Sequence, residues 1–244
     1  MTTRRAHHAS ALRDLGDDAV VAYLDAHSGL PGPRADLELV QAFAQVCGTA
    51  APALVDGLLA DPDEFRRMCA TVALAPRLLA ATTAGDRSRV VVALRDRASD
   101  GSWRVREGVA TAWQLVGDAD PELLRSTMAG WAADGPALVR RAAVAALCEP
   151  RLLHDAATTG AALTACATAT TFLASRSADE RPTPEVRTLR QALGYCWSVA
   201  VAADPERGVA AFLPLTGSSD PDVAWVVREN RKKKRMPALP VTAT

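Results

Sequence analysis

A short pattern recurs along this chain: an aspartate is followed six residues later by an arginine. The four copies are Asp61/Arg67, Asp100/Arg106, Asp134/Arg140 and Asp222/Arg228. Each copy opens an apolar stretch, and the successive aspartates are 39, 34 and 88 residues apart. The last interval is close to two periods with a degenerate unit between them. A recurring period of this size is typical of stacked helical hairpins.

Two longer self-matches support the repeat. Residues 100–107 and 222–229 share the pattern Asp-x-x-Trp-x-Val-Arg-Glu. Residues 66–79 and 140–153 both begin with Arg-Arg and end with Pro-Arg-Leu-Leu, at a constant shift of 74 residues. The sequence therefore predicts one kind of helical unit used several times.

On these residues, from Asp61 to Arg235, the sequence resembles the HEAT repeats. Their paired antiparallel helices often carry an aspartate in the turn and an arginine six residues later, and the two residues form a ladder along the stack. The resemblance implies an all-α, right-handed α-solenoid of about six hairpins, with the four Asp/Arg pairs as a structural ladder. The run Leu193–Ser198 also resembles a group of alanine-rich bacterial HEAT-repeat proteins. Such repeats serve many unrelated functions, so the resemblance predicts a fold and no activity.

Helix start and stop signals divide the chain into six hairpins. The predicted helix pairs are 17–27 with 37–46, 51–60 with 63–79, 87–98 with 103–116, 121–133 with 137–148, 155–174 with 185–203, and 205–213 with 222–235. Gly48 is predicted to end the second helix. We expect residues 1–9 to be disordered, 10–236 to form a single solenoid domain and 237–244 to be a flexible tail.

The composition fits closely packed helices. Apolar residues make up 49% of the chain and aromatic residues only 5%, so the predicted core consists mainly of Ala, Leu and Val. The formal net charge is zero, which argues against a surface that is basic throughout and leaves room for local basic patches.

The five cysteines are spread through apolar helical patterns, with no close pair in the sequence. They are Cys47, Cys69, Cys148, Cys166 and Cys196. This spacing predicts buried free thiols, no metal site, no cofactor and a reducing, cytoplasmic location. The sequence shows neither the apolar run of a signal peptide nor a membrane span.

Arginines recur in the second helices of the pairs, which usually line the concave face of such a stack. Those outside the ladder are candidates for ligand binding: Arg66, Arg104, Arg141, Arg187 and Arg190. Tyr195, Lys232 and Lys233 are further candidates. The last two belong to the cation run Arg231–Arg235, which either complements the end of the final helix or contacts phosphates. We therefore expect a monomeric, non-catalytic protein that binds a protein or a nucleic acid on its concave face.

One enzymatic alternative stays open, because the sequence also resembles a DNA-repair family, the HEAT-like alkylpurine DNA glycosylases. In that resemblance Trp103 and Glu107 match its tryptophan and carboxylate, Arg141 its backbone-binding arginine, and Gly194-Tyr195 a Gly-Trp pair. The aromatic rings would hold a cationic alkylated base, and the carboxylate would stabilise the positive charge that develops on the sugar. The Trp-x-x-x-Glu pair recurs at Trp225/Glu229, as a repeat consensus does.

Overall fold

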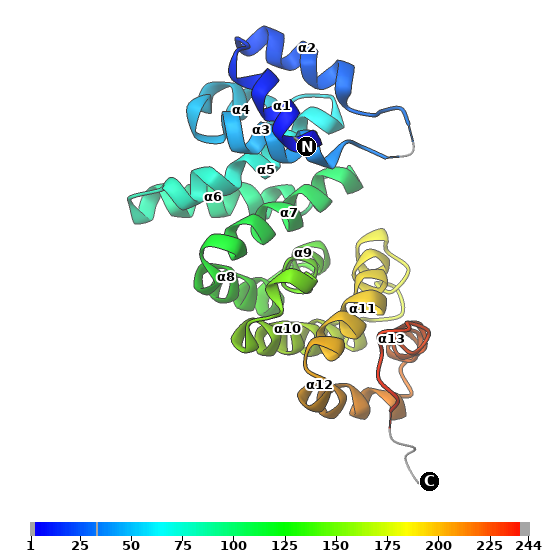
Figure 1. Ribbon diagram of the computed structural model, residues 1–244. Coiled ribbons are helices and arrows are strands. Elements are labelled where there is room, and N and C mark those ends of the chain that lie inside the picture. Colours follow the sequence, from blue (N-terminus) through cyan, green and yellow to red (C-terminus); the bar gives the residue numbers. More distant parts are fainter. Residues whose placement is uncertain (1–2, 33, 240–244) are drawn as a thin grey trace. The chain divides into compact units, whose positions relative to one another are not determined.

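The computed structural model describes residues 3–32 and 34–239, and in these ranges the chain forms α-helices and two short 3-10 helices without any strand (Figure 1). The predicted all-α architecture of stacked helical hairpins is confirmed. By its internal contacts the chain divides into two compact units, Met1–Ala119 and Asp120–Thr244. A single solenoid domain over residues 10–236 stays a prediction of the sequence. No helix within the described ranges is both long and apolar enough to cross a bilayer.

The first unit is built on a layer of four helices, in which α1 packs on α3, α3 on α5 and α5 on α7. Helices α4 and α6 pack against α5, and α2 also contacts α5. The bounds are α1 Arg4–Arg13, α2 Asp17–His27, α3 Leu37–Ala50, α4 Pro52–Leu58, α5 Glu64–Ala80, α6 Ala84–Arg97 and α7 Trp103–Ala119. Phe43, Phe65 and Trp113 are the largest fully buried side chains of this unit.

The second unit has two layers. Helices α9, α11 and α13 stack in one, and α8, α10 and α12 in the other. The bounds are α8 Pro121–Asp134, α9 Ala137–Leu147, α10 Ala156–Ala174, α11 Pro184–Ala203, α12 Pro205–Phe212 and α13 Pro221–Arg231, with 3-10 turns at Pro150–Leu152 and Leu213–Gly217. Trp197 and Phe212 meet in its core with ring centroids 5.4 Å apart.

Aspartate caps explain why several of these helices begin close to where the sequence predicts. The side chains of Asp63, Asp120 and Asp204 accept hydrogen bonds from backbone N–H groups in the first turns of α5, α8 and α12. A proline follows the cap of α8 and of α12. At this first helical position a backbone N–H would have no partner within the helix, so its absence in proline costs no hydrogen bond.

The N-terminus differs from the prediction, because residues 4–9 belong to α1 instead of being disordered. Thr3 caps this helix, and His8 is buried against α3. The His8 ring hydrogen-bonds to the Tyr23 hydroxyl at 2.9 Å and to the Asp36 carboxylate at 3.1 Å. The pattern of apolar residues does not reveal the buried face of α1, because that face includes a histidine whose hydrogen-bond partners are distant in the sequence. Residues 1 and 2 lie outside the described part.

Gly48 does not end α3, contrary to the prediction. It lies inside the helix, where a Cβ atom would come within 2.4 Å of the Pro76 ring on α5. The glycine therefore permits close approach of two stacked helices.

The end of the chain also differs from the prediction. The last helix, α13, ends at Arg231 instead of residue 235, and a turn follows in which the Met236 N–H donates to the Lys233 carbonyl. Residues 237–239 are irregular, and the remainder of the expected tail, 240–244, lies outside the described residues.

Candidate functional site

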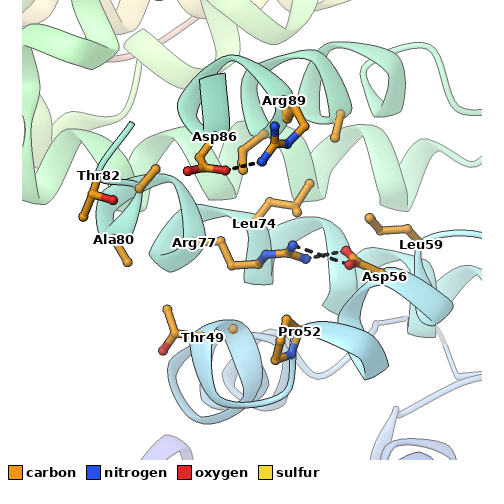
Figure 2. A pocket seen from close by; sticks show the side chains of 14 residues that line it. Thr49, Pro52, Asp56, Leu59, Leu74, Arg77, Ala80, Thr82, Asp86 and Arg89 are labelled. Atoms are coloured by element: carbon orange, nitrogen blue, oxygen red, sulfur yellow. Dashed lines mark hydrogen bonds and ion pairs between the residues drawn. The ribbon is translucent and has the colours of Figure 1, made fainter. Parts of the chain in front are cut away.

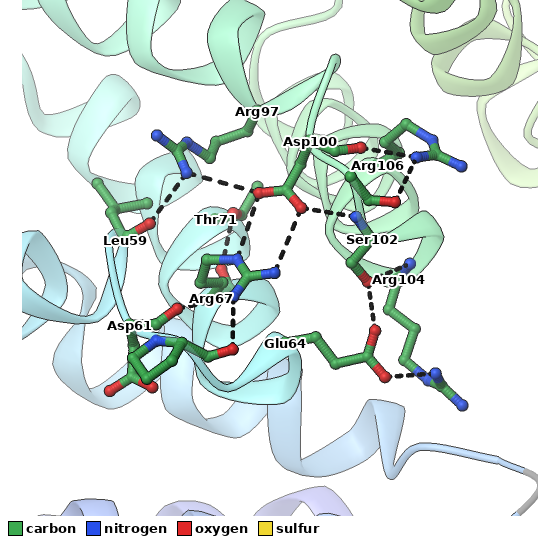
Figure 3. A network of polar contacts seen from close by, with 12 residues as sticks. Leu59, Asp61, Glu64, Arg67, Thr71, Arg97, Asp100, Ser102, Arg104 and Arg106 are labelled. Atoms are coloured by element: carbon green, nitrogen blue, oxygen red, sulfur yellow. Dashed lines mark hydrogen bonds and ion pairs between the residues drawn. The ribbon is translucent and has the colours of Figure 1, made fainter. Parts of the chain in front are cut away.

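Three of the four recurring arginines donate to backbone carbonyls in the segment just before their own helix. Arg67 donates to the carbonyl oxygens of Asp61 and Pro62 at 2.7 and 2.9 Å (Figure 3). Arg106 does the same one repeat later, with Asp100 and Gly101 at 2.6 and 3.1 Å. Arg140 donates to the carbonyls of Ala132, Ala133 and Gly135. The six-residue spacing thus serves a contact between a guanidinium and backbone oxygens.

The carboxylate of Asp100 links neighbouring repeats. It accepts hydrogen bonds from Arg67 of α5 at 3.3 and 3.4 Å, and Arg97 lies 3.6 Å away (Figure 3). It also accepts from the N–H of Ser102 at 2.8 Å. Its side chain is only 9% exposed, so the contacts form in a partly buried setting.

The carboxylates of Asp61 and Asp222 are paired differently from the prediction. The Asp61 carboxylate pairs with Arg66, at 3.2 Å, and not with Arg67. Asp222 pairs with Arg181 at 2.9 Å and Arg190 at 2.7 Å. Arg228, its predicted partner, is exposed and lies 3.9 Å from Glu229. Asp134 is the exposed last residue of α8.

For Asp222 the reason is a displacement of the repeated sequence by about one helical turn. Asp100 lies three residues before α7, whereas Asp222 is the second residue of α13. Nevertheless, Asp222 has the same kind of partner in its repeat as Asp100 has in its own. Arg190 of α11, the preceding stacked helix, donates to Asp222, and Arg67 of α5 donates to Asp100. Sequence identity between the two segments is therefore a poor guide to which residues pair.

Three of the arginines predicted to bind a ligand are already neutralised by carboxylates. Arg66 donates to both oxygens of Asp25, at 2.8 and 2.5 Å, and the Asp25 hydrogen bonds raise its pKa. Arg104 donates to Glu64 at 2.6 Å (Figure 3). Its guanidinium also lies over the Trp103 ring, 4.8 Å from the ring centre. Together with Arg190, which pairs with Asp222, they do not supply a row of free cations.

The remaining candidates on the second helices lie on different elements. Arg187 is exposed on α11, and Arg141 is partly buried on α9. Trp103, 57% exposed, and Glu107 lie on α7 of the first unit. The glycosylase-like set of Trp103, Glu107, Arg141 and Tyr195 is therefore divided between the two units.

Trp225, which matches Trp103 in the repeat, has a packing role. It is partly buried, and Arg190 lies 4.8 Å from the centre of its ring. A Cβ atom on Gly194 would come within 2.7 Å of that ring. Gly194 is thus explained by the close contact of α11 with the tryptophan of α13.

A group of cations gathers on an exposed aromatic ring at the end of the second unit. Tyr195 is 45% exposed, with the Arg235 guanidinium 4.7 Å and the Lys233 ammonium 5.8 Å from its ring centre. We call Tyr195, Lys233 and Arg235 the Tyr195 cluster. The turn after α13 brings these two cations back over α11, so the cluster depends on the helix ending at Arg231.

Charges around the Tyr195 cluster are nearly all positive. Arg231 and Lys234 are exposed. Lys232 donates to Glu229 at 2.7 Å, and this hydrogen bond together with neighbouring cations holds the pKa of Glu229 below its ordinary value. Residues 228–235 contain six cations and one carboxylate.

An open hollow of about 540 Å³ lies beside this cluster and shares Arg235 with it. Its other lining residues are Pro150, Leu153, His154, Val199, Ala202 and Ala203. The walls are thus mostly apolar, with one cation and one histidine.

The first unit has a comparable hollow, of about 530 Å³, between α4, α5 and α6 (Figure 2). Its charged groups are paired with one another, Arg77 with Asp56 and Arg89 with Asp86. This hollow therefore offers a ligand little uncompensated charge.

All five cysteines are buried and free, as their apolar surroundings predict. Burial raises the pKa of the Cys47 thiol to about 11, with Asp17 as a further cause. The sulfur atoms of Cys148 and Cys166 lie 3.7 Å apart, a proximity that the sequence spacing does not reveal. Among the described residues, no group of three or more His, Cys, Asp or Glu is arranged to hold a metal ion.

Comparison with known proteins gives no family. No protein-family model and no curated protein matches the sequence. Among solved structures, a designed armadillo repeat protein is similar over 84% of this chain and 97% of its own, with 16% identity and a TM-score of 0.31. At that score the likeness adds nothing to the fold assignment, which rests on the helices described above. They define an all-α protein of stacked helical hairpins.

Proposed function

We propose that this protein is a non-catalytic, HEAT-like binding protein whose partner is a nucleic acid. The observation that carries the proposal is the concentration of cations at the end of the second unit, around an exposed tyrosine ring. Phosphate backbones are bound chiefly by such groups of Lys and Arg, and aromatic rings add contacts to bases.

The charge distribution favours this segment over the rest of the chain. The first unit contains 13 Lys and Arg against 15 Asp and Glu, and the second contains 15 against 13. Six of the second unit's cations and only one of its carboxylates lie in residues 228–235. The surplus of positive charge in this unit therefore comes entirely from that short segment.

Stabilisation of the helix end does not account for all of these cations. The favourable interaction with a helix dipole falls off within the last turn. Since α13 ends at Arg231, Lys233, Lys234 and Arg235 lie beyond that turn. A function for them in binding an anionic partner explains their number.

The predicted site on the concave face receives less support than the end of the second unit. Arg66 and Arg104 are held by Asp25 and Glu64, so a phosphate would have to compete with a carboxylate at each. We therefore propose the segment 228–235 as the primary contact, in a protein that acts as a monomer in the cytoplasm.

Fluorescence anisotropy with a labelled oligonucleotide over a salt series tests this function. We expect micromolar or weaker affinity near physiological salt and a steep loss of affinity as salt rises. The double change Lys233→Ala/Arg235→Ala should flatten the slope of log affinity against log salt by about 1.5. The matched control Arg66→Ala/Arg104→Ala should leave the slope nearly unchanged. Absence of binding at low salt, or an equal slope for both double variants, would refute the proposal.

A further inference from the structure

The Tyr195 cluster and the neighbouring hollow share Arg235 and one face of α11. Tyr195, Val199 and Ala202 are spaced four and three residues apart, so they lie on one stripe of the helix. Tyr195 stands exposed at one end of the stripe, and Val199 and Ala202 line the hollow. Arg235 contacts the tyrosine ring and also lines the hollow, so a cation lies where the two regions meet.

This order of groups matches the chemistry of an unpaired nucleotide chain. Bases that are not paired expose their flat apolar faces, which stack on aromatic rings, and the backbone between them carries the phosphates. In a duplex the same faces are covered by neighbouring base pairs, so a lone surface ring gains no stacking contact. A ring and an apolar hollow on either side of an arginine therefore favour a single strand.

We infer that the second unit binds single-stranded nucleic acid, with one base stacked on Tyr195 and an adjacent base in the hollow against Leu153 and Val199. The phosphate that joins them meets the exposed guanidinium of Arg235, and Lys233 contacts the next phosphate. This inference rests on the proposed function and adds the class of nucleic acid and the position of the bases.

Anisotropy with three probes tests it: a labelled thymidine oligonucleotide, a duplex of the same length, and heparin as a polyanion without bases. In the intact chain the single strand should bind more tightly than the duplex. Tyr195→Leu keeps an apolar side chain but removes the ring, and should weaken single-strand binding about 10-fold while changing duplex and heparin binding less than about 2-fold.

Tyr195→Phe is the matched control, because it keeps the ring and loses only the hydroxyl; it should retain single-strand affinity. Ala202→Phe narrows the hollow without altering charge and should also weaken only the single strand. Circular dichroism melts of each variant establish that the fold is kept, since Tyr195 and Ala202 are exposed and their replacement should leave stability intact.

The outcomes separate this inference from the proposed function. Equal affinity for single strand and duplex, together with no effect of Tyr195→Leu, would overturn the inference. The proposed function would then stand, with a surface that binds nucleic acid only through the charge of its phosphates. No binding of either nucleic acid at low salt would overturn both.

Discussion

Asp100 is the residue on which neighbouring repeats of the first unit most depend. Its carboxylate accepts from Arg67 and from the Ser102 N–H and lies near Arg97, while these two arginine side chains are only 18% and 31% exposed. Asp100→Ala should therefore cost about 1–3 kcal/mol, because it leaves two partly buried guanidinium groups without their carboxylate. Urea unfolding followed by circular dichroism measures this cost.

The matched control for Asp100 is Asp56→Ala, which removes an aspartate that is 58% exposed and paired with Arg77. A pair this open to solvent should contribute less than about 1 kcal/mol. Equal costs for the two changes would mean that Asp100 is an ordinary surface ion pair, and the account of the inter-repeat link would have to be withdrawn.

Asp220 makes the stability of the second unit depend on pH. Burial alone would raise the pKa of its carboxyl group, but hydrogen bonds from Arg181 and from the N–H groups of Val223 and Asp222 lower it below its ordinary value. A lowered folded-state pKa gives stability that is present above the unfolded pKa, about 4, and is lost as pH falls through the folded value.

We therefore expect the urea midpoint of the second unit to fall as pH falls from about 5 through the unfolded pKa and on toward the lower folded pKa of Asp220. Asp220→Asn keeps a capping oxygen and removes the charge, so wild type and variant should differ at neutral pH and converge in acid. A difference that is the same at both pH values would contradict this assignment.

Among whole elements, α3 and α5 owe their close packing to Gly48. Alanine is a better helix former than glycine by about 1 kcal/mol, so Gly48→Ala would be stabilising if space allowed. The added Cβ would instead lie 2.4 Å from the Pro76 Cγ and 3.0 Å from the Ala73 carbonyl, so we expect destabilisation by about 1–3 kcal/mol. Gly57→Ala in α4, with nothing within 4 Å, should be neutral or stabilising. Thermal melts compare the two, and a stabilised Gly48 variant would show that the helices separate easily.

The helices themselves could be predicted from the sequence, because their signals are local. Asp120-Pro121 and Asp204-Pro205 mark starts that depend only on adjacent residues. Helix α1 could not be found in this way, since it is held by His8, whose partners Tyr23 and Asp36 come from other elements.

The candidate site was predicted only in part for the same reason. The sequence indicates Tyr195 and Lys233 as candidates, but their contact depends on α13 ending at Arg231. The charged run 231–235 carries no stop signal such as glycine or proline before Pro237. The ion pairs of Arg66 with Asp25 and of Arg104 with Glu64 join residues 41 and 40 positions apart, which no local pattern reveals.

At the scale of the whole molecule, the division into two compact units predicts how the chain loses structure. Stacked repeats contact only their neighbours, so a destabilising substitution should first increase local unfolding within its own unit. Gly48→Ala weakens the first unit at α3 and α5. Its counterpart in the second is Asn230→Ala, because the buried Asn230 side chain accepts from the Ser198 N–H and donates to the Leu193 and Val226 carbonyls.

Hydrogen exchange of the two variants, followed by mass spectrometry of their peptides, tests this prediction. We expect Gly48→Ala to speed exchange in α3, α5 and α7 while α11 and α13 keep wild-type protection, and Asn230→Ala to do the reverse. Both variants are needed, because a single variant that destabilises the protein only slightly could leave exchange in the other unit unchanged for that reason alone. If both variants lower protection throughout residues 3–239 by the same factor, the chain unfolds as one cooperative body and the boundary at Ala119 has no energetic meaning.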